Sequence, residues 1–280
     1  CRLDSGWFDN LITDAGLNLM GTGDILNACQ VGSGTATPAV TDTSLASFVA
    51  GTTFVQQATK AAQASAPYYG STTRRFRFGA GDAAGNLSEV GIGSAATGGT
   101  LFSRALITDA GGSPTTITVL SDEFLDVTYQ VQCVPPTADS TFNITDSGPA
   151  GTVHAVTLRA ASVTSANASN GWVTNGGAVT QGFWPTIYSG AIGAITELPS
   201  GTANALGVDG TQAYVNNSLE RVTQFTFGLD DNVGDVASLF VPFKNLGGSW
   251  QMGFDPVIPK TDTDTLAFTF KVSWTRTTAL

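Results

Sequence analysis

Along most of the chain, apolar and polar residues alternate with a period of two, which is the pattern of a half-buried β-strand. The clearest example is near the end, where apolar residues stand at 266, 268, 270, 272 and 274 with polar or small residues between them. Segment 125–133 has the same alternation and stops before Val134-Pro135-Pro136. Further strand-like segments are 74–78, 87–92, 101–107, 115–119, 152–159, 219–227 and 238–241. Turn residues separate these segments, so the sequence predicts an all-β fold with antiparallel pairing.

Two short helical segments are expected before these strands. In residues 5–20 the apolar positions 7, 8, 11, 12, 15 and 19 fit one face of a helix, with Asp4 or Ser5 as the N-cap. A single helical turn is expected over residues 44–49.

The proline pair at 135–136 marks the predicted domain boundary, because consecutive prolines cannot continue a strand ladder. We therefore expect an N-terminal β domain, residues 1–134, with a helical start and a role in assembly or attachment. Residues 135–280 are expected to form a C-terminal β-sandwich domain.

Composition and charge limit the partners of this 280-residue chain. Its apolar residues, 42% of the chain, are enough to bury a core. Its charged residues, at 12%, are fewer than solvent-exposed helices usually carry. The net charge of −10 disfavours binding to phosphate backbones, which requires clustered cations. We expect no nucleic-acid partner. No run approaches the roughly 20 apolar residues of a membrane helix, so no membrane insertion is expected.

The three cysteines Cys1, Cys29 and Cys133 are dispersed and have no CxxC spacing. They predict neither a disulfide framework nor a zinc site, although a bridge between Cys29 and Cys133 stays open at this stage. Cys1 also leaves open a lipid-anchored protein.

Two parts of the sequence resemble a known class of proteins. The first is Asn10-Leu11-Ile12-Thr13-Asp14-Ala15-Gly16-Leu17-Asn18, followed by the turn-rich segment 31–45. The second is the proline-flanked lead-in 254–261, a Thr/Asp turn and an aromatic strand that ends near Trp274-Thr275-Arg276. This combination resembles virion structural proteins of tailed bacteriophages, of the tail or tail-fibre kind. The resemblance covers about the first 50 residues, roughly 85–132 and the last 60.

The resemblance implies a non-enzymatic component of a virion, assembled in the host cytoplasm and associated with the tail as a fibre, tip or collar. It implies a homo-oligomer, expected to be a trimer, that contacts other virion proteins and can touch a glycan on the host surface. A capsid decoration protein is the alternative, and a secreted or lipid-anchored bacterial adhesin is a further one.

Candidate contact residues come from a loop-rich region of the second half. Trp172, Trp184 and Tyr188 lie in sequence rich in Gly, Ser and Asn, where aromatic rings can lie flat against sugars. The alternative is that these rings anchor long loops onto the sheets beneath them.

Evidence for catalytic or metal chemistry is sparse in the sequence. Asp230, Asp231 and Asp235 form an oxygen-rich loop and are weak metal candidates, but the loop departs from the EF-hand spacing and reads equally as a β-turn. His154 is the one histidine and lies within an alternating strand, where a structural role is expected. Paired carboxylates of a glycosidase would have to come from Asp122, Glu123, Asp126, Glu197 and Glu220. We expect no enzymatic activity and no cofactor.

Overall fold

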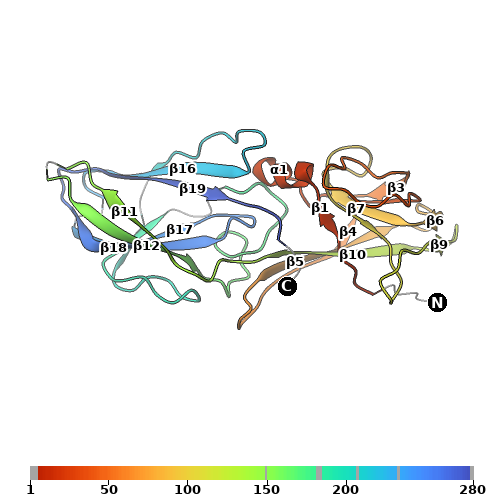
Figure 1. Cartoon of the computed structure of the whole chain (residues 1–280), viewed down its shortest axis with the longest axis horizontal. Coiled ribbons are helices and arrows are strands. Elements are labelled where there is room, and N and C mark those ends of the chain that lie inside the picture. Colours follow the sequence, from red (N-terminus) through yellow and green to blue (C-terminus); the bar gives the residue numbers. More distant parts are fainter. Residues whose placement is uncertain (1–5, 149, 181–184, 206–207, 232–233, 278–280) are drawn as a thin grey trace.

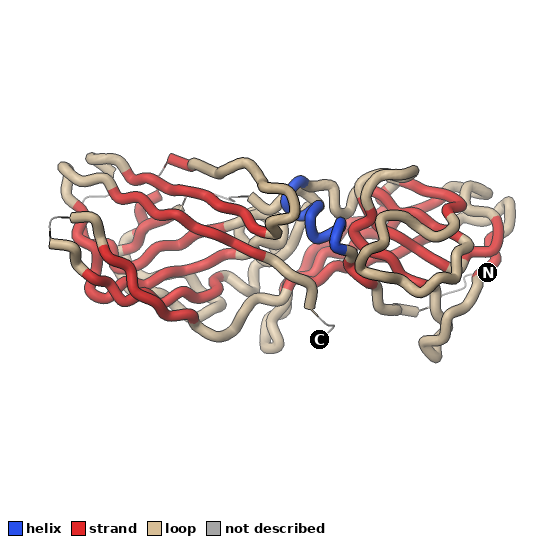
Figure 2. The backbone as a smooth tube through the Cα atoms, turned by 45° about the horizontal axis from the view of Figure 1, so that its top comes forward, coloured by secondary structure: helices blue, strands red, loops and turns tan. Residues whose placement is uncertain are grey.

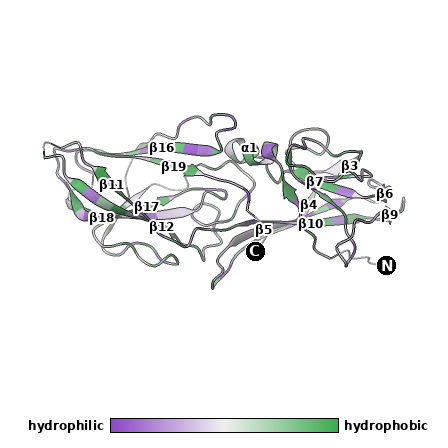
Figure 3. Cartoon of the chain, viewed as in Figure 1, coloured by the Kyte–Doolittle hydropathy of each residue, from purple (hydrophilic) through white to green (hydrophobic). Residues whose placement is uncertain are grey.

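The chain folds into two β-lobes arranged end to end along one long axis (Figures 1 and 2). The computed structural model describes residues 6–277 except 149, 181–184, 206–207 and 232–233. Strands make up 44% of the chain and helices 3%, so the predicted all-β class is confirmed. Hydrophilic and hydrophobic residues are interspersed along the strands of both lobes, as the period of two requires (Figure 3).

The N-terminal lobe contains two antiparallel sheets, a small two-stranded ribbon and one helix. Sheet 1 has five strands, in the order β1 (Leu11–Ile12), β8 (Leu101–Leu106), β7 (Glu89–Gly93), β2 (Ala28–Gly32) and β3 (Phe48–Thr52). Sheet 2 has three strands, in the order β10 (Leu125–Cys133), β5 (Gly70–Phe78) and β4 (Val55–Ala62). The ribbon pairs β6 (Gly85–Leu87) with β9 (Ile117–Val119), and the helix is α1 (Asp14–Thr22).

Sheets 1 and 2 pack face to face around buried aromatic and aliphatic side chains. Phe76 and Phe78 point inward from β5, and Phe102 points inward from β8. The two sheets are also linked by a hydrogen bond of 3.1 Å from the Ser103 hydroxyl to the Tyr129 hydroxyl. The alternation along β5 therefore places Arg75 and Arg77 on the opposite face of sheet 2.

The C-terminal lobe has the same two-layer organisation. Sheet 3 has six strands, in the order β11 (Ser140–Thr145), β12 (Val153–Ala161), β18 (Ser249–Lys260), β17 (Gly234–Pro242), β13 (Thr186–Tyr188) and β14 (Ala203–Ala205). Sheet 4 has three, in the order β15 (Val208–Asp209), β16 (Glu220–Phe227) and β19 (Leu266–Ser273). Phe254 of sheet 3 stacks on Phe268 of sheet 4 with ring centroids 5.5 Å apart, so the layers enclose an aromatic core.

Each of these sheets draws its strands from one side of the linker 134–139 between β10 and β11. The predicted boundary at 134/135 lies within this linker. The lobes are nevertheless joined closely, because one cluster of buried apolar side chains includes residues of both.

Helix α1 forms the centre of the joint between the lobes. The Trp274 indole donates to the Leu17 carbonyl at 2.8 Å, and the Val179 amide donates to the Met20 carbonyl at 2.7 Å. Gly21 lies so close to the Tyr214 ring that an added Cβ would be 2.3 Å from a ring carbon. We call α1, residues 172–179, 212–221 and 274–276 the joint.

The structure corrects both predicted helices. Leu11 and Ile12 are not helical but pair with β8, and the helix begins at Asp14 with Thr13 as its N-cap. The spacing of apolar residues in 7–12 fits a strand or a helix, and pairing with a distant strand decided between them. Residues 44–49 form no helical turn, and their end enters strand β3.

Within the part of the chain that the structure describes, no helix has the length and apolar character needed to cross a membrane.

Candidate functional site

Trp172 and Tyr188 are buried, so their prediction as receptor contacts is wrong for this structure. Trp172 is 3% exposed, its indole donates to the Ala161 carbonyl at 3.1 Å, and its ring meets Trp250 edge-on. Tyr188 is 8% exposed in β13 and packs with Phe240. Trp172 anchors its loop to sheet 3, which is the alternative that the sequence left open, whereas Tyr188 is a core residue of sheet 3 itself. Trp184 lies outside the described residues.

The candidate metal loop serves as a turn between β16 and β17. The Asp231 carboxylate accepts the backbone N–H of Gly228 at 2.7 Å, and Asp235 is exposed within β17. Among the described residues, no group of three or more Asp, Glu, His or Cys side chains is arranged to hold a metal ion. Asp230 and Asp231 thus occupy the β-turn that was the alternative interpretation.

The candidate glycosidase carboxylates are distributed over both lobes, and most have local structural partners. Glu123 accepts the N–H of Leu120, and Glu197 accepts that of Ala194, each within its own turn. Asp126 pairs with Arg77, and Glu220 pairs with Lys271, across neighbouring strands. These contacts account for turns and sheet pairs, and nothing in them assembles two acids around a common substrate.

His154 fastens a loop of the C-terminal lobe to strand β18. Its ring is fully buried, and Nδ1 lies 2.7 Å from the Pro256 carbonyl, which can only accept, so Nδ1 carries the proton. Nε2 lies 3.4 Å from Asp146 Oδ2. The structural role predicted for this histidine matches its position between the β11–β12 turn and β18.

The contact between His154 and Asp146 depends on pH through the Asp146 carboxyl group. Loss of solvent contact alone would raise the pKa of its carboxyl, but hydrogen bonds from His154, Thr152 and Gly148 outweigh that effect and lower the pKa below its usual value. Its contribution to stability is therefore complete above the unfolded-state pKa of about 4 and is lost as pH falls through the lowered folded-state value.

We expect Asp146→Asn to reduce the slope of stability against pH on the acid side. The measurement is the urea midpoint of unfolding at a series of pH values from neutral to acid, with Asp255→Asn, an exposed residue of β18, as the matched control. Identical acid-side slopes for Asp146→Asn and wild type would contradict the assignment.

Three charged side chains organise the long loop 33–47 of the N-terminal lobe. Glu89 is fully buried and accepts the backbone N–H groups of Gly34, Ala46 and Ser47. Arg104, 3% exposed, donates to Glu89 at 2.8 Å and to Asp42 at 2.6 Å. Glu89 contacts Nε and Nη2 of the guanidinium and Asp42 contacts Nη1, so both carboxylates are paired with Arg104 and the network holds the loop in place.

Cys29 and Cys133 are free thiols, which excludes the bridge left open by the sequence. Burial raises the pKa of Cys133 to about 12 and raises that of Cys29 as well. Both thiols are therefore protonated near neutral pH and behave as core residues rather than nucleophiles.

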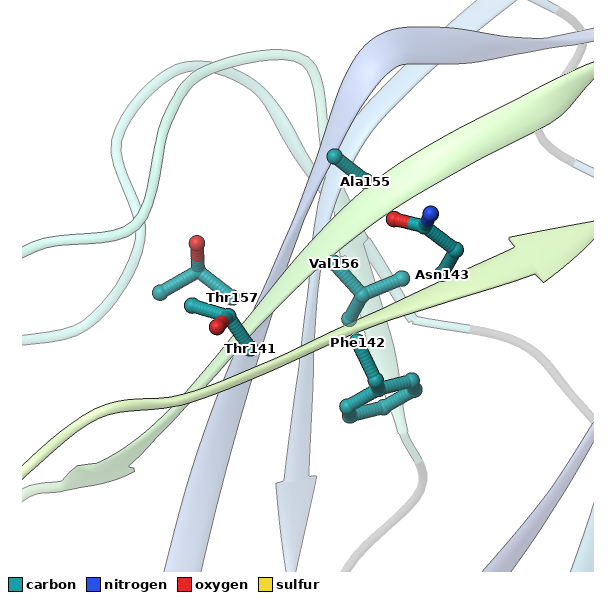
Figure 4. A pocket seen from close by; sticks show the side chains of 6 residues that line it. All are labelled: Thr141, Phe142, Asn143, Ala155, Val156 and Thr157. Carbon is teal, nitrogen blue, oxygen red and sulfur yellow. The ribbon is translucent and has the colours of Figure 1, made fainter.

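A shallow hollow of about 470 Å³ lies on β11 and β12 at the edge of sheet 3 (Figure 4). Thr141 and Thr157 are cross-strand neighbours at one end, and Asn143 and Ala155 at the other, whereas Phe142 points away. Its six lining residues are uncharged. The hollow can accept hydrogen-bonding contacts but has no acid or base for catalysis.

A further candidate contact surface is the side of sheet 2 that faces away from the core, which we call the outer face. Arg77 donates to both carboxylate oxygens of Asp126 at 2.7 Å, and Gln130 donates to Thr73 at 3.0 Å. The guanidinium of Arg77 also lies over the exposed ring of Phe124, 5.7 Å from its centroid. The outer face is thus a polar surface with an aromatic residue at one end.

Strand β4 borders this outer face and is one of several strands, with β3, β13, β14 and β15, that the sequence did not predict. The six residues Gln56–Ala61 are all exposed, although they belong to both faces of the sheet. With neither face buried there is no apolar alternation, and the only signal available in the sequence was a run of β-compatible, uncharged residues broken by Lys60.

The chain matches no protein-family model, no curated protein and no solved structure.

Proposed function

We propose that the protein is a non-enzymatic structural component of a phage virion, most closely associated with the tail, that assembles with copies of itself and with other virion proteins. Its role is mechanical: it forms part of an extended β-rich assembly and presents surface to a neighbour or to the host. The resemblance of the opening segment and of the C-terminal strand to tail and tail-fibre proteins is the origin of the proposal.

The observation that carries it is the long two-lobed body with a closely bonded joint. Arg276 of the last segment pairs with Asp14 and donates to the Ile12 carbonyl, while Asn18 of α1 bonds to Asn216. Contacts of this kind on several sides of α1 resist bending between the lobes. A stiff, elongated subunit with an unpaired strand at a sheet edge fits a structural component that holds neighbouring proteins in position or carries mechanical load.

The buried charges fit the same role. Arg104, Glu89, His154 and Arg221 each bind main-chain groups or an oppositely charged side chain within the fold. In the described residues these groups fix loops, and their geometry gives no reason to assign a reaction.

Gold-labelled antibody raised against the purified chain, applied to intact phage particles that carry its gene, tests the proposal. Label on the tail or its fibres is the expected result. Label on the head would replace the tail assignment with capsid decoration, and particles without label, alongside a positive control for a known virion protein, would overturn the virion proposal.

A further inference from the structure

We propose that two copies of this chain pair through strand β4, about a two-fold axis at Thr59, so that two sheets 2 become one continuous six-stranded sheet. Copies of the chain thus join through one defined sheet edge, and this contact can be tested on the isolated chain. Its outcome is therefore separate from where the protein lies in a virion.

Strand β4 is exposed along most of its length. It is an edge strand of sheet 2 and pairs with β5 on one side only. Gln56–Ala61 are exposed on both faces of the sheet, whereas antiparallel strands in folded chains ordinarily bury at least one face. A long edge of this kind is a template for pairing with another strand.

Strand β4 also lacks the features that block such pairing. Its sequence, Val-Gln-Gln-Ala-Thr-Lys-Ala-Ala, contains no proline. The register shift lies at its start, between Val55 and Gln57, and leaves 57–62 in regular pairing with β5. The one charge, Lys60, is held by the Asn175 side-chain oxygen at 2.7 Å rather than pointing along the free edge.

The distribution of charge favours a second copy of this chain as the partner of β4. Each copy carries a net charge of −10, so most surfaces of two copies repel each other. Strand β4 contains no carboxylate, and Asp126 across the outer face is neutralised by Arg77. Two acidic copies can approach at this edge with little repulsion, and the backbone of an antiparallel edge is complementary to itself.

The register follows from the direction of the backbone groups. Gln63 donates its N–H to the Tyr69 carbonyl at 2.9 Å, and hydrogen-bonded positions alternate along an antiparallel ladder. Thr59 therefore directs its N–H toward β5, whereas Ala58 and Lys60 direct theirs toward the open edge. A two-fold axis at Thr59 pairs Ala58 of each copy with Lys60 of the other and places the two Thr59 side chains opposite each other.

This contact closes as a dimer, in contrast to the trimer expected from the sequence resemblance. Thr–Thr neighbours in a non-hydrogen-bonded pair are favourable, and their Cα atoms are about 4.5 Å apart. That distance is within the range that a disulfide can span.

Cysteine cross-linking tests the register directly. Under mild oxidation Thr59→Cys is expected to give a covalent dimer on a non-reducing gel. Thr128→Cys, an exposed position of β10 at the other edge of the same sheet, and the wild-type chain are expected to stay uncross-linked.

Sedimentation tests the contact without cross-linking. Wild type is expected to be a dimer, and Thr59→Lys, which opposes two like charges, is expected to raise the dissociation constant by about tenfold, while Thr128→Lys leaves it unchanged. A monomeric wild type, a trimer, or a dimer that responds equally to both lysine variants would overturn the proposal.

Discussion

Replacing Arg104 with Met is expected to destabilise the N-terminal lobe by about 3–5 kcal/mol. The guanidinium is the cationic partner of Glu89, which is fully buried and cannot recover its solvation when Arg104 is removed. The loop carbonyl of Ala36 loses its donor as well. Chemical denaturation followed by tryptophan fluorescence and circular dichroism measures the change in the free energy of unfolding.

The matched control is Arg77→Met in the same lobe. Arg77 also pairs with a carboxylate, Asp126, but both side chains are 33% exposed, so solvent screens the pair and the loss of stability is expected to be much smaller than for Arg104→Met. The double variant Glu89→Gln/Arg104→Met should be less destabilised than the sum of the single variants, because it removes the unpaired charge. Equal effects of the Arg104 and Arg77 variants would contradict the importance assigned to burial.

The second large effect is expected for Arg221→Met in the joint. Arg221 is 7% exposed and donates to the carbonyls of Val179, Gln212 and Gly21, which come from three separate segments. Methionine retains the volume but leaves these acceptors without a donor, for a loss of about 3 kcal/mol. We expect faster hydrogen exchange in α1, since the end of this helix is one of the three segments.

Lys271→Met provides the comparison for this variant. Lys271 lies on β19 beside β16 and pairs with Glu220, but its side chain is 60% exposed. The control should leave both stability and exchange in α1 close to wild type. Loss of stability in Arg221→Met without any change in α1 would show that the arginine supports only the C-terminal lobe.

Strands with one buried face were predictable from the sequence. The alternation in 125–133 and at 266–272 corresponds to β10 and β19, where the apolar positions face the core and the polar ones face outward. The hydrophobic effect favours burial of the apolar face of each such segment, whatever strand it pairs with. The alternation can therefore be recognised without knowledge of the topology.

Elements whose environment depends on distant residues were not predictable in this way. Leu11 and Ile12 became a strand through pairing with β8, and β4 has no buried face to mark it. The aromatic residues Trp172 and Tyr188 illustrate the same limit for candidate sites. A large ring among small residues is compatible with a contact surface or with an anchor, and only the positions of Ala161 and Phe240 distinguished the two.

The joint also sets an order of events during synthesis of the chain. The helix at its centre emerges from the ribosome early, but its partners Trp274 and Arg276 are 257 and 264 residues later than the groups they bind. Contacts of such long sequence separation form slowly and late. The N-terminal sheets and the contact of α1 with β8 can therefore form first, while the side of α1 that faces the C-terminal lobe stays uncovered until the last strand is made. Nascent or truncated chains that lack this strand would carry an open helix face, and they are the species in which aggregation or capture by chaperones should concentrate.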